Sequence, residues 1–179
     1  MNPKCQLPLL AAFAAALVGA PRALADPAVP QVVVPENLPA VTFSIPRYQL
    51  TSLERETVAA CLVLEAASQG TEGMRAVMAV IRNRSSGRPE LFSPTVLRQK
   101  QFSALNRVTA GRESLGHAID RARRDRMWSR ALQLVDESVS DTWRDPTLGA
   151  THYTRAVEST RWTRSLAKTV TIGAHSFYR

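Results

Sequence analysis

Cysteine is scarce in this sequence: its 179 residues include two, Cys5 and Cys61. Cys5 precedes an apolar stretch near the N-terminus and Cys61 lies inside a later one, so no internal disulfide framework is expected. A catalytic thiol would need a histidine-type partner and access to solvent. Because Cys61 stands between Ala60 and Leu62, we expect it to be a small core residue.

A hydrophobic run long enough to cross a membrane is also lacking. The apolar stretch LPLLAAFAAALVGA follows Lys4 and is shorter than the roughly 20 residues that a spanning helix needs. The sequence Ala23-Leu24-Ala25 comes next, and a charged start, an apolar centre and an A-x-A site are typical of a signal peptide. We predict a signal peptide over 1–25 and an exported protein, periplasmic or secreted, without stable membrane insertion after cleavage. The alternative is a membrane anchor.

Acidic residues are outnumbered, because 15 Asp and Glu stand against 23 Lys and Arg, for a net charge of +8. A basic protein suits an anionic partner. Export makes nucleic acid a poor choice, whereas a cell wall with peptide carboxylates and lactyl groups fits better. The alternative is a basic surface that is simply solvated, which charge alone does not exclude.

Proline is concentrated in one segment, residues 26–50, which contains five prolines. Proline opposes helices and central strands, so this segment is expected to be an extended tether. The remaining residues, 51–179, show no internal repeat or low-complexity block and have the length of one domain with a core.

The domain is predicted to be mainly helical. Thr51 and Glu54 have the spacing of a capping box, and the apolar segment that follows runs to Gln69-Gly70. Capping signals and apolar residues recurring at helical spacing predict helices over 52–68, 71–85, 93–99, 113–123 and 128–139. Pro146 and Gly149 predict a loop over 144–153.

Strand-forming residues come late in the chain. Residues 169–172 favour a strand, Gly173-Ala174 can turn, and 175–179 can return as a second strand. We therefore expect an α+β fold, in which helices carry the core and a small β-hairpin or sheet lies at the C-terminal end.

Glu65 is the only charged residue of the apolar run 58–67. On a helix it shares a face with Cys61 and Leu62, with Gln69 one turn further on. A carboxyl kept away from water either holds its proton or finds a partner. Because a general acid must be protonated, we interpret Glu65 as a catalytic acid. The alternative is a structural ion pair with an arginine of another helix.

Residues suited to a sugar site lie in or near the predicted loops. Aromatic rings stack on sugar rings, and Gln, Ser, Thr and His side chains can hydrogen-bond hydroxyl and acetamido groups. Binding residues are often carried by loops. The predicted substrate-binding residues are Gln69, Gln101, Phe102, Ser103, Thr151, His152, Tyr153 and Trp162.

These segments together resemble the SleB-like cell wall hydrolase family, the spore-cortex-lytic type of enzyme. The resemblance extends from about Thr51 to Arg179 and is carried by LEAASQGTEGMRAVMAVIRNR (64–84), QFS (101–103), DPTLGATHY (145–153) and WTRSLAKTVTIGAHSFYR (162–179). It implies a fold similar to lysozyme and lytic transglycosylases. It also implies that Glu65 is the catalytic acid, that 101–102 and 151–153 line a groove, and that Asn83-Arg84 end the second helix.

The sequence departs from the family pattern just after Glu65. The family often has Glu-Ala-Arg-Gly-Glu, whereas this chain has Glu65-Ala66-Ala67-Ser68-Gln69. If the second glutamate of that pattern has a chemical role, Gln69 cannot supply it as a base.

The resemblance implies lytic transglycosylase chemistry on peptidoglycan, which needs a single carboxyl group. Glu65 would protonate the glycosidic oxygen after N-acetylmuramic acid (MurNAc) and then accept the proton of that sugar's C6 hydroxyl, giving a 1,6-anhydro product. Most glycosidases use two carboxylates, and the sequence identifies no convincing second one. Simple hydrolysis remains the alternative. The expected partner is the MurNAc-GlcNAc glycan strand of the cell wall. We expect the protein to be a monomer and to need no cofactor.

Two functions of other classes stay open. One is a metal-dependent amidase or peptidase with Glu65, His152 and His175 as ligands; these residue types suit zinc, but their spacing matches no known motif, and no metal is expected. The other is a non-catalytic peptidoglycan-binding module in which Glu65 is a buried structural group.

Overall fold

The computed structural model describes residues 48–158 and 161–179. The predicted signal peptide over 1–25 and nearly all of the predicted tether over 26–50 lie outside the described residues. Among the residues that are described, no helix has both the length and the apolar character to cross a membrane.

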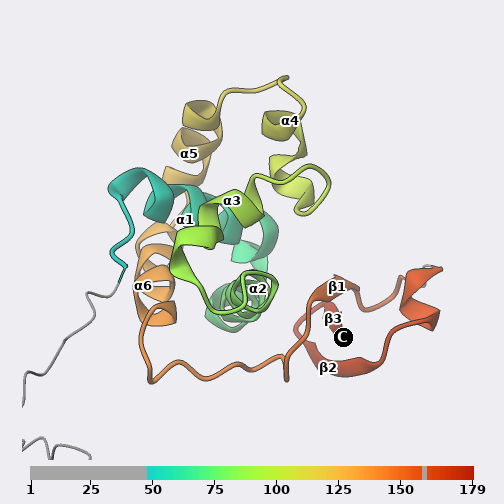
Figure 1. Cartoon of the computed structure of the whole chain (residues 1–179). Helices are drawn as coiled ribbons and strands as arrows, with labels where there is room; N and C mark the ends of the chain where they lie inside the picture. The colour runs from blue at the N-terminus through green and yellow to red at the C-terminus, as the bar shows by residue number, and fades with distance from the viewer. Residues whose placement is uncertain (1–47, 159–160) are drawn as a thin grey trace, which may run out of the picture. The chain divides into compact units, whose positions relative to one another are not determined.

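Helix α1 (Ser52–Ala66) is the central helix of the domain. Its predicted capping box is present: the Thr51 hydroxyl accepts from the Glu54 N–H at 3.3 Å, and the Glu54 carboxylate accepts from the Thr51 N–H at 2.8 Å. Every residue from 57 to 63 is buried, Cys61 included, as predicted. A helical segment without a polar face must be covered on all sides. Contacts come from α2 (Gly70–Arg84), α3 (Phe92–Val96), α5 (Leu115–Arg123) and α6 (Trp128–Ser138) (Figure 1).

The predicted helices are present with shifted ends. The first one ends at Ala66 and continues as a 3₁₀ turn over Ala67–Gln69, after which Gly70 has a φ of +68° and the chain turns into α2. Helix α4 (Asn106–Thr109) was not expected, because four residues are too few to show a period. Further 3₁₀ turns lie at Pro89–Leu91, Ser103–Leu105 and Trp162–Arg164.

The described residues also form a three-stranded antiparallel sheet. Its strands are β1 (His152–Arg155), β2 (Lys168–Ile172) and β3 (His175–Tyr178), in the order β1-β3-β2. The predicted hairpin is present as β2 and β3. The predicted loop over 144–153 is wrong at its end, because His152 and Tyr153 begin β1 and pair with Tyr178 and Phe177.

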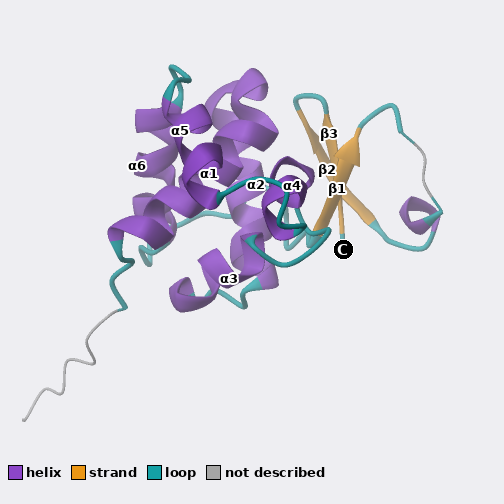
Figure 2. Ribbon diagram, turned by 90° about the horizontal axis from the view of Figure 1, so that it is seen from above, coloured by secondary structure: helices purple, strands orange, loops and turns teal. Residues whose placement is uncertain are grey.

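The sheet packs on the helices through one apolar face. Phe177 of β3 is buried against Ala76 and Val80 of α2, together with Ala150. Figure 2 shows the strands gathered to one side of the helices. The expected α+β fold, mainly helical with a small sheet, is confirmed.

Candidate active site

Glu65 lies in the last turn of α1, where its carboxylate accepts three hydrogen bonds from described residues. Oε1 accepts from the backbone N–H of Ala104 at 2.7 Å and from the Ser103 hydroxyl at 3.1 Å. Oε2 accepts from the Tyr153 hydroxyl at 2.9 Å. No ion pair to Glu65 occurs in residues 48–158 and 161–179. The alternative of a structural ion pair with an arginine is therefore not what the structure contains.

Glu65 opens onto a hollow of about 520 Å³, hereafter the Glu65 groove. This volume falls within the roughly 300–1,000 Å³ that is usual for ligand sites. Helix α1, the segment between α3 and α4, and the sheet all contribute to it. The lining residues are Leu64, Glu65, Arg84, Lys100, Gln101, Ser103, Asn106, Tyr153, Thr154, Arg155, Glu158 and His175. Glu65, Gln101, Ser103 and Tyr153 are the predicted site residues that the fold brings together here.

Tyr153 is held in place by other aromatic rings. Its ring stacks on Phe177 with centroids 5.7 Å apart and meets the edge of His175 at 5.3 Å. Burial raises the pKa of Tyr153 well above its usual value, and the negative charge of Glu65 raises it further. The phenol therefore keeps its proton and acts as a hydrogen-bond donor to Glu65.

Arg84, at the end of α2, joins two walls of the groove. Its Nε donates to the carbonyl of Thr151 at 2.6 Å, and one of its terminal nitrogens donates to the carbonyl of Gln101 at 3.1 Å. The guanidinium also lies over the ring of Phe102, 4.9 Å from its centroid. Burial lowers the pKa of Arg84. A single side chain thus connects the start of β1 to the segment that leads to Ser103.

Asn83 and Asp145 shape the loop that leads into β1. The Asn83 amide donates to Asp145 at 2.9 Å and to the carbonyl of Ala150 at 2.9 Å. Asp145 also accepts from the N–H and hydroxyl of Thr147 and from the N–H of Gly149. Burial pushes the pKa of Asp145 upward, but hydrogen bonds from Thr147, Asn83 and Gly149 outweigh it and the pKa is lowered. Asp145 therefore organises the loop.

Phe102 and Thr151 do not line the Glu65 groove. The structure contradicts a stacking role for Phe102, whose side chain is 2% exposed and packs below Arg84 and beside Tyr153. Thr151 is committed to the protein itself: its N–H donates to the Tyr178 carbonyl at 2.9 Å, and its carbonyl accepts from Arg84. Both residues support the wall without offering a side chain to the groove.

His152 and Trp162 lie on the face of the sheet opposite Tyr153. Successive residues of a strand point to opposite faces, so His152 and Tyr153 are separated. The ring of His152 packs on Trp162 at 5.6 Å, and Trp162 meets the edge of Tyr178 at 5.4 Å. Neither His152 nor Trp162 lines the Glu65 groove, and their contact with substrate stays a prediction.

Gln69, a predicted substrate-binding residue, makes a contact within the protein. Its Oε1 accepts from the N–H of Ala174, in the turn between β2 and β3, at 2.8 Å. A Cβ at Gly173 would lie 2.7 Å from this oxygen, so the glycine allows the close approach. Gln69 does not line the Glu65 groove; it joins the 3₁₀ turn after α1 to the turn before His175.

The predicted substrate-binding residues omit several that line the groove, above all Arg155, Glu158 and His175, the last of which was considered only as a metal ligand. His175 is 9% exposed, and its Nδ1 has no hydrogen-bond partner among the described residues. Burial lowers its pKa, which keeps the imidazole neutral near pH 7. Alternation along β3 alone places His175 on the same face as Phe177. That this face meets Tyr153 of β1 follows only from the pairing of the two strands, which the sequence does not show.

The residues do not converge as the metal-dependent alternative requires. His152 and His175 belong to opposite faces of the sheet, since His152 packs on Trp162 and His175 packs on Tyr153. Across the described part of the chain, no group of three or more His, Cys, Asp or Glu side chains has the geometry of a metal site.

Comparison with known proteins identifies the family. A family model described as Cell Wall Hydrolase matches residues 68–178, beginning just after Glu65. The catalytic domain of the germination-specific lytic transglycosylase SleB from Bacillus anthracis has a similar fold, with a TM-score of 0.55 and 22% sequence identity over 75% of this chain and 100% of that chain. A search of curated proteins gives no match. Because the family model covers more than half of the sequence, this chain belongs to the cell wall hydrolase family, whose members cleave peptidoglycan.

Proposed function

We propose that this cell wall hydrolase cuts peptidoglycan glycan strands as a lytic transglycosylase, with Glu65 acting first as acid and then as base. One observation carries the proposal. Glu65 is held at the groove by three neutral donors, and it has no cationic partner within residues 48–158 and 161–179. An exposed acid, or one neutralised by an arginine, would not support this role.

The reaction has two proton transfers. Protonated Glu65 donates to the glycosidic oxygen that follows MurNAc, the bond from C1 to that oxygen breaks, and the next sugar leaves as an alcohol. The Glu65 carboxylate then removes the proton of the C6 hydroxyl, whose oxygen bonds to C1. The product carries a 1,6-anhydro ring, Glu65 is protonated again, and no water is consumed.

The donors around Glu65 suit the state between these two steps. At that point Glu65 is a carboxylate facing a positively charged sugar ring. Ser103, Ala104 and Tyr153 already point at its oxygens, so the charge forms without rearrangement of the site. Fixed donors directed at a developing charge are among the largest contributions to catalysis.

Hydrolysis is the second candidate, because the groove contains another carboxylate. Glu158 lines it and accepts a hydrogen bond from the Thr154 hydroxyl at 2.8 Å. Were Glu158 to activate a water molecule, the product would be a reducing sugar. A hydrolase that depends on this base loses activity in Glu158→Gln, whereas the transglycosylase forms anhydro ends without it.

The test is digestion of purified peptidoglycan, followed by mass spectrometry of the soluble fragments. Wild type should release fragments with 1,6-anhydro-MurNAc ends, and Glu65→Gln should lower the rate by about 10²–10⁴-fold, the usual effect of losing a general acid. Glu72→Gln, which changes an exposed glutamate outside the groove, is the matched control. Anhydro fragments released at the wild-type rate by Glu65→Gln would contradict the proposal.

The binding-module alternative is separated by the same variants. A non-catalytic module would bind sacculi and release nothing in either form. Reducing ends as the main product would favour hydrolysis, and release blocked by a chelator would favour the metal-dependent class.

This function requires the protein to reach the wall. The predicted signal peptide over 1–25, a periplasmic or secreted location and a monomeric state belong to the proposal. Expression with its own N-terminus should yield a mature form beginning at Asp26, which N-terminal sequencing detects.

A further inference from the structure

A second hollow lies next to the Glu65 groove, on the side of α4. It has a volume of about 230 Å³ and is hereafter the Lys100–Arg112 hollow; Gln99, Lys100, Asn106, Thr109, Ala110 and Arg112 line it. Lys100 and Asn106 line both hollows, so the two are neighbours. The lining contains two cations, two amides and a hydroxyl, and no carboxylate, which gives it the chemistry of an anion site.

The two cations are available for a ligand. Among described residues, neither Lys100 nor Arg112 is part of an ion pair. The neighbouring acid, Glu113, pairs instead with Arg107 of α4 and Arg121 of α5. These ion pairs of Glu113 link the α4 segment to α5. Because Glu113 is occupied by them, it does not neutralise the positive charge of the hollow.

The backbone at Lys100 is unusual in the same place. Its φ is +59°, in the left-handed region where residues other than glycine are uncommon and cost about 1–2 kcal/mol. This conformation turns the chain sharply at the residue that separates the two hollows. Backbone strain of this kind tends to persist at functional sites.

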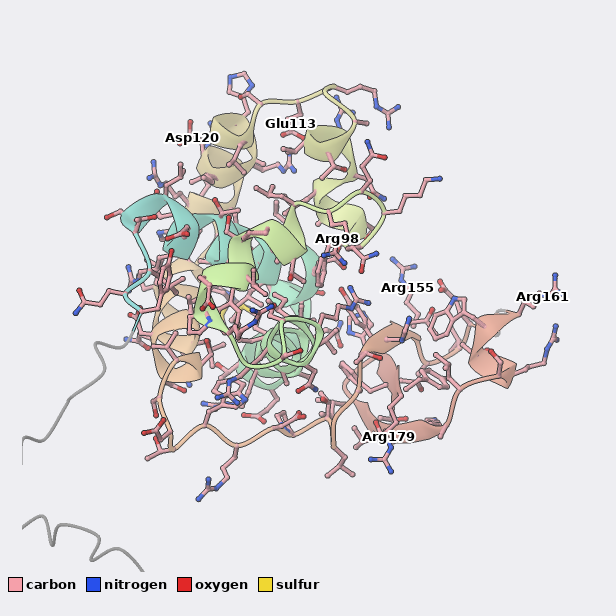
Figure 3. All side chains as sticks on the ribbon, in the orientation of Figure 1. Arg98, Glu113, Asp120, Arg155, Arg161 and Arg179 are labelled. Carbon is pink, nitrogen blue, oxygen red and sulfur yellow. The ribbon has the colours of Figure 1, made fainter. Side chains whose placement is uncertain are left out.

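The opposite wall of the groove adds further positive charge. Arg155 of β1 lines the Glu65 groove, and Figure 3 shows it extending from the sheet on the side of the helices, toward the segment that carries Arg98. Arg155 shares this wall with the carboxylate of Glu158, so the attraction for an anionic substrate is strongest at the Lys100–Arg112 hollow, where it raises the local substrate concentration.

We infer that the Lys100–Arg112 hollow binds ionised carboxylates of the stem peptide that branches from MurNAc. The inference rests on the proposed function, since it assumes that the glycan strand occupies the Glu65 groove. The stem peptide leaves the sugar through its lactyl group, so it emerges beside the strand. Arg112 and Lys100 then pair with its carboxylates, while Asn106 and Gln99 bind its amides. The enzyme consequently prefers strands that carry stem peptides.

The test compares two substrates made from one peptidoglycan: strands with stem peptides, and strands from which an amidase has removed them. The stripped strands keep the lactyl carboxylate and lack those of the peptide. We expect the kcat/KM of wild type to be about tenfold higher on stem-bearing strands than on stripped strands. This is the gain in binding that a few partly exposed, charge-assisted contacts supply. Arg112→Gln should bring the ratio of the two kcat/KM values close to one, while Arg124→Gln, an exposed arginine outside both hollows, should leave it unchanged.

A binding measurement separates this inference from the proposed reaction. Glu65→Gln protein should bind stem-bearing strands about tenfold more tightly than stripped strands, and adding Arg112→Gln should remove the difference. Converting the peptide carboxylates to methylamides should have the same effect as removing the peptide. Equal binding of both substrates overturns the inference whatever reaction the protein performs. Cleavage that persists in Glu65→Gln overturns the proposed function and leaves this binding result unaffected.

Discussion

The hydroxyl of Tyr153 on β1 donates to Oε2 of Glu65 on α1 at 2.9 Å, although the two residues are separated by 88 positions in the sequence. This bond connects the sheet to the helix that carries the proposed acid. It makes the catalytic geometry depend on how the sheet is placed.

Removing this hydroxyl tests that dependence. Tyr153→Phe keeps the ring on Phe177 and His175 and removes only the donor to Glu65. A hydrogen bond to a charged group contributes about 1.5–3 kcal/mol, so we expect kcat to fall by about 10–100-fold. Steady-state rates on soluble glycan strands measure the effect, and near-UV circular dichroism checks that the packing is retained. An unchanged kcat would separate Tyr153 from the reaction.

Gln69 offers a test of how the β2–β3 turn is held. Gln69→Glu keeps an oxygen that can accept from Ala174, whereas Gln69→Leu keeps the size and loses the acceptor. We expect Leu to lower the free energy of unfolding by about 1 kcal/mol and Glu to remain close to wild type at neutral pH. Urea denaturation gives the stability, and hydrogen exchange at the Ala174 amide reports the bond itself. Similar exchange in both variants would argue against this contact.

Arg84 should be intolerant of replacement by lysine. One ammonium group cannot reproduce a fork that reaches the carbonyls of Thr151 and Gln101 while lying on Phe102. We expect Arg84→Lys to destabilise the protein by about 2–3 kcal/mol and to lower activity, because two walls of the groove lose their connection. Arg88→Lys, on an exposed side chain, is the control in thermal and urea unfolding. Equal stability of the two variants would contradict the role of Arg84.

Asp145 predicts how the stability responds to acid. Its pKa is lowered in the folded protein, because the hydrogen bonds that it accepts outweigh its burial. A lowered pKa stabilises the fold above the unfolded value of about 3.9, and this contribution is lost as pH falls through the folded pKa. Asp145→Asn should therefore be less stable than wild type at pH 7, by about 1–3 kcal/mol. The difference should shrink below about pH 4, which urea titrations at several pH values would detect. A constant difference across that range would exclude this explanation.

Local patterns in the sequence were sufficient to single out Glu65. The segment 57–63 of its helix is buried on every side, so a lone charge in the apolar run 58–67 is visible without knowledge of the fold. The capping box at Thr51 and the spacing of apolar residues are equally local, and they located the helices to within a few residues.

The surroundings of Glu65 depend on pairing between distant segments. Whether His152 or Tyr153 faces Glu65 is decided by the register of β1 on β3, and a shift of one residue would exchange them. Pro146 and Gly149 extended the predicted loop to residue 153, so the start of β1 at His152 was not predicted. Phe102 was interpreted as an exposed loop aromatic because the side chain that packs over it, Arg84, comes from α2, a distant part of the sequence. Gln69 gave no local sign of its partner in the β2–β3 turn.

The order of the strands has a consequence for when the protein becomes active. Strands β1 and β2 each pair with β3 and not with one another, and β3 is synthesised last of the three. Until β3 has been synthesised, Tyr153 has no paired strand to hold it and His175 is absent. The proposed acid therefore has Ser103 and Ala104 beside it early in biosynthesis, but the Tyr153 donor is fixed in place only when β3 pairs with β1.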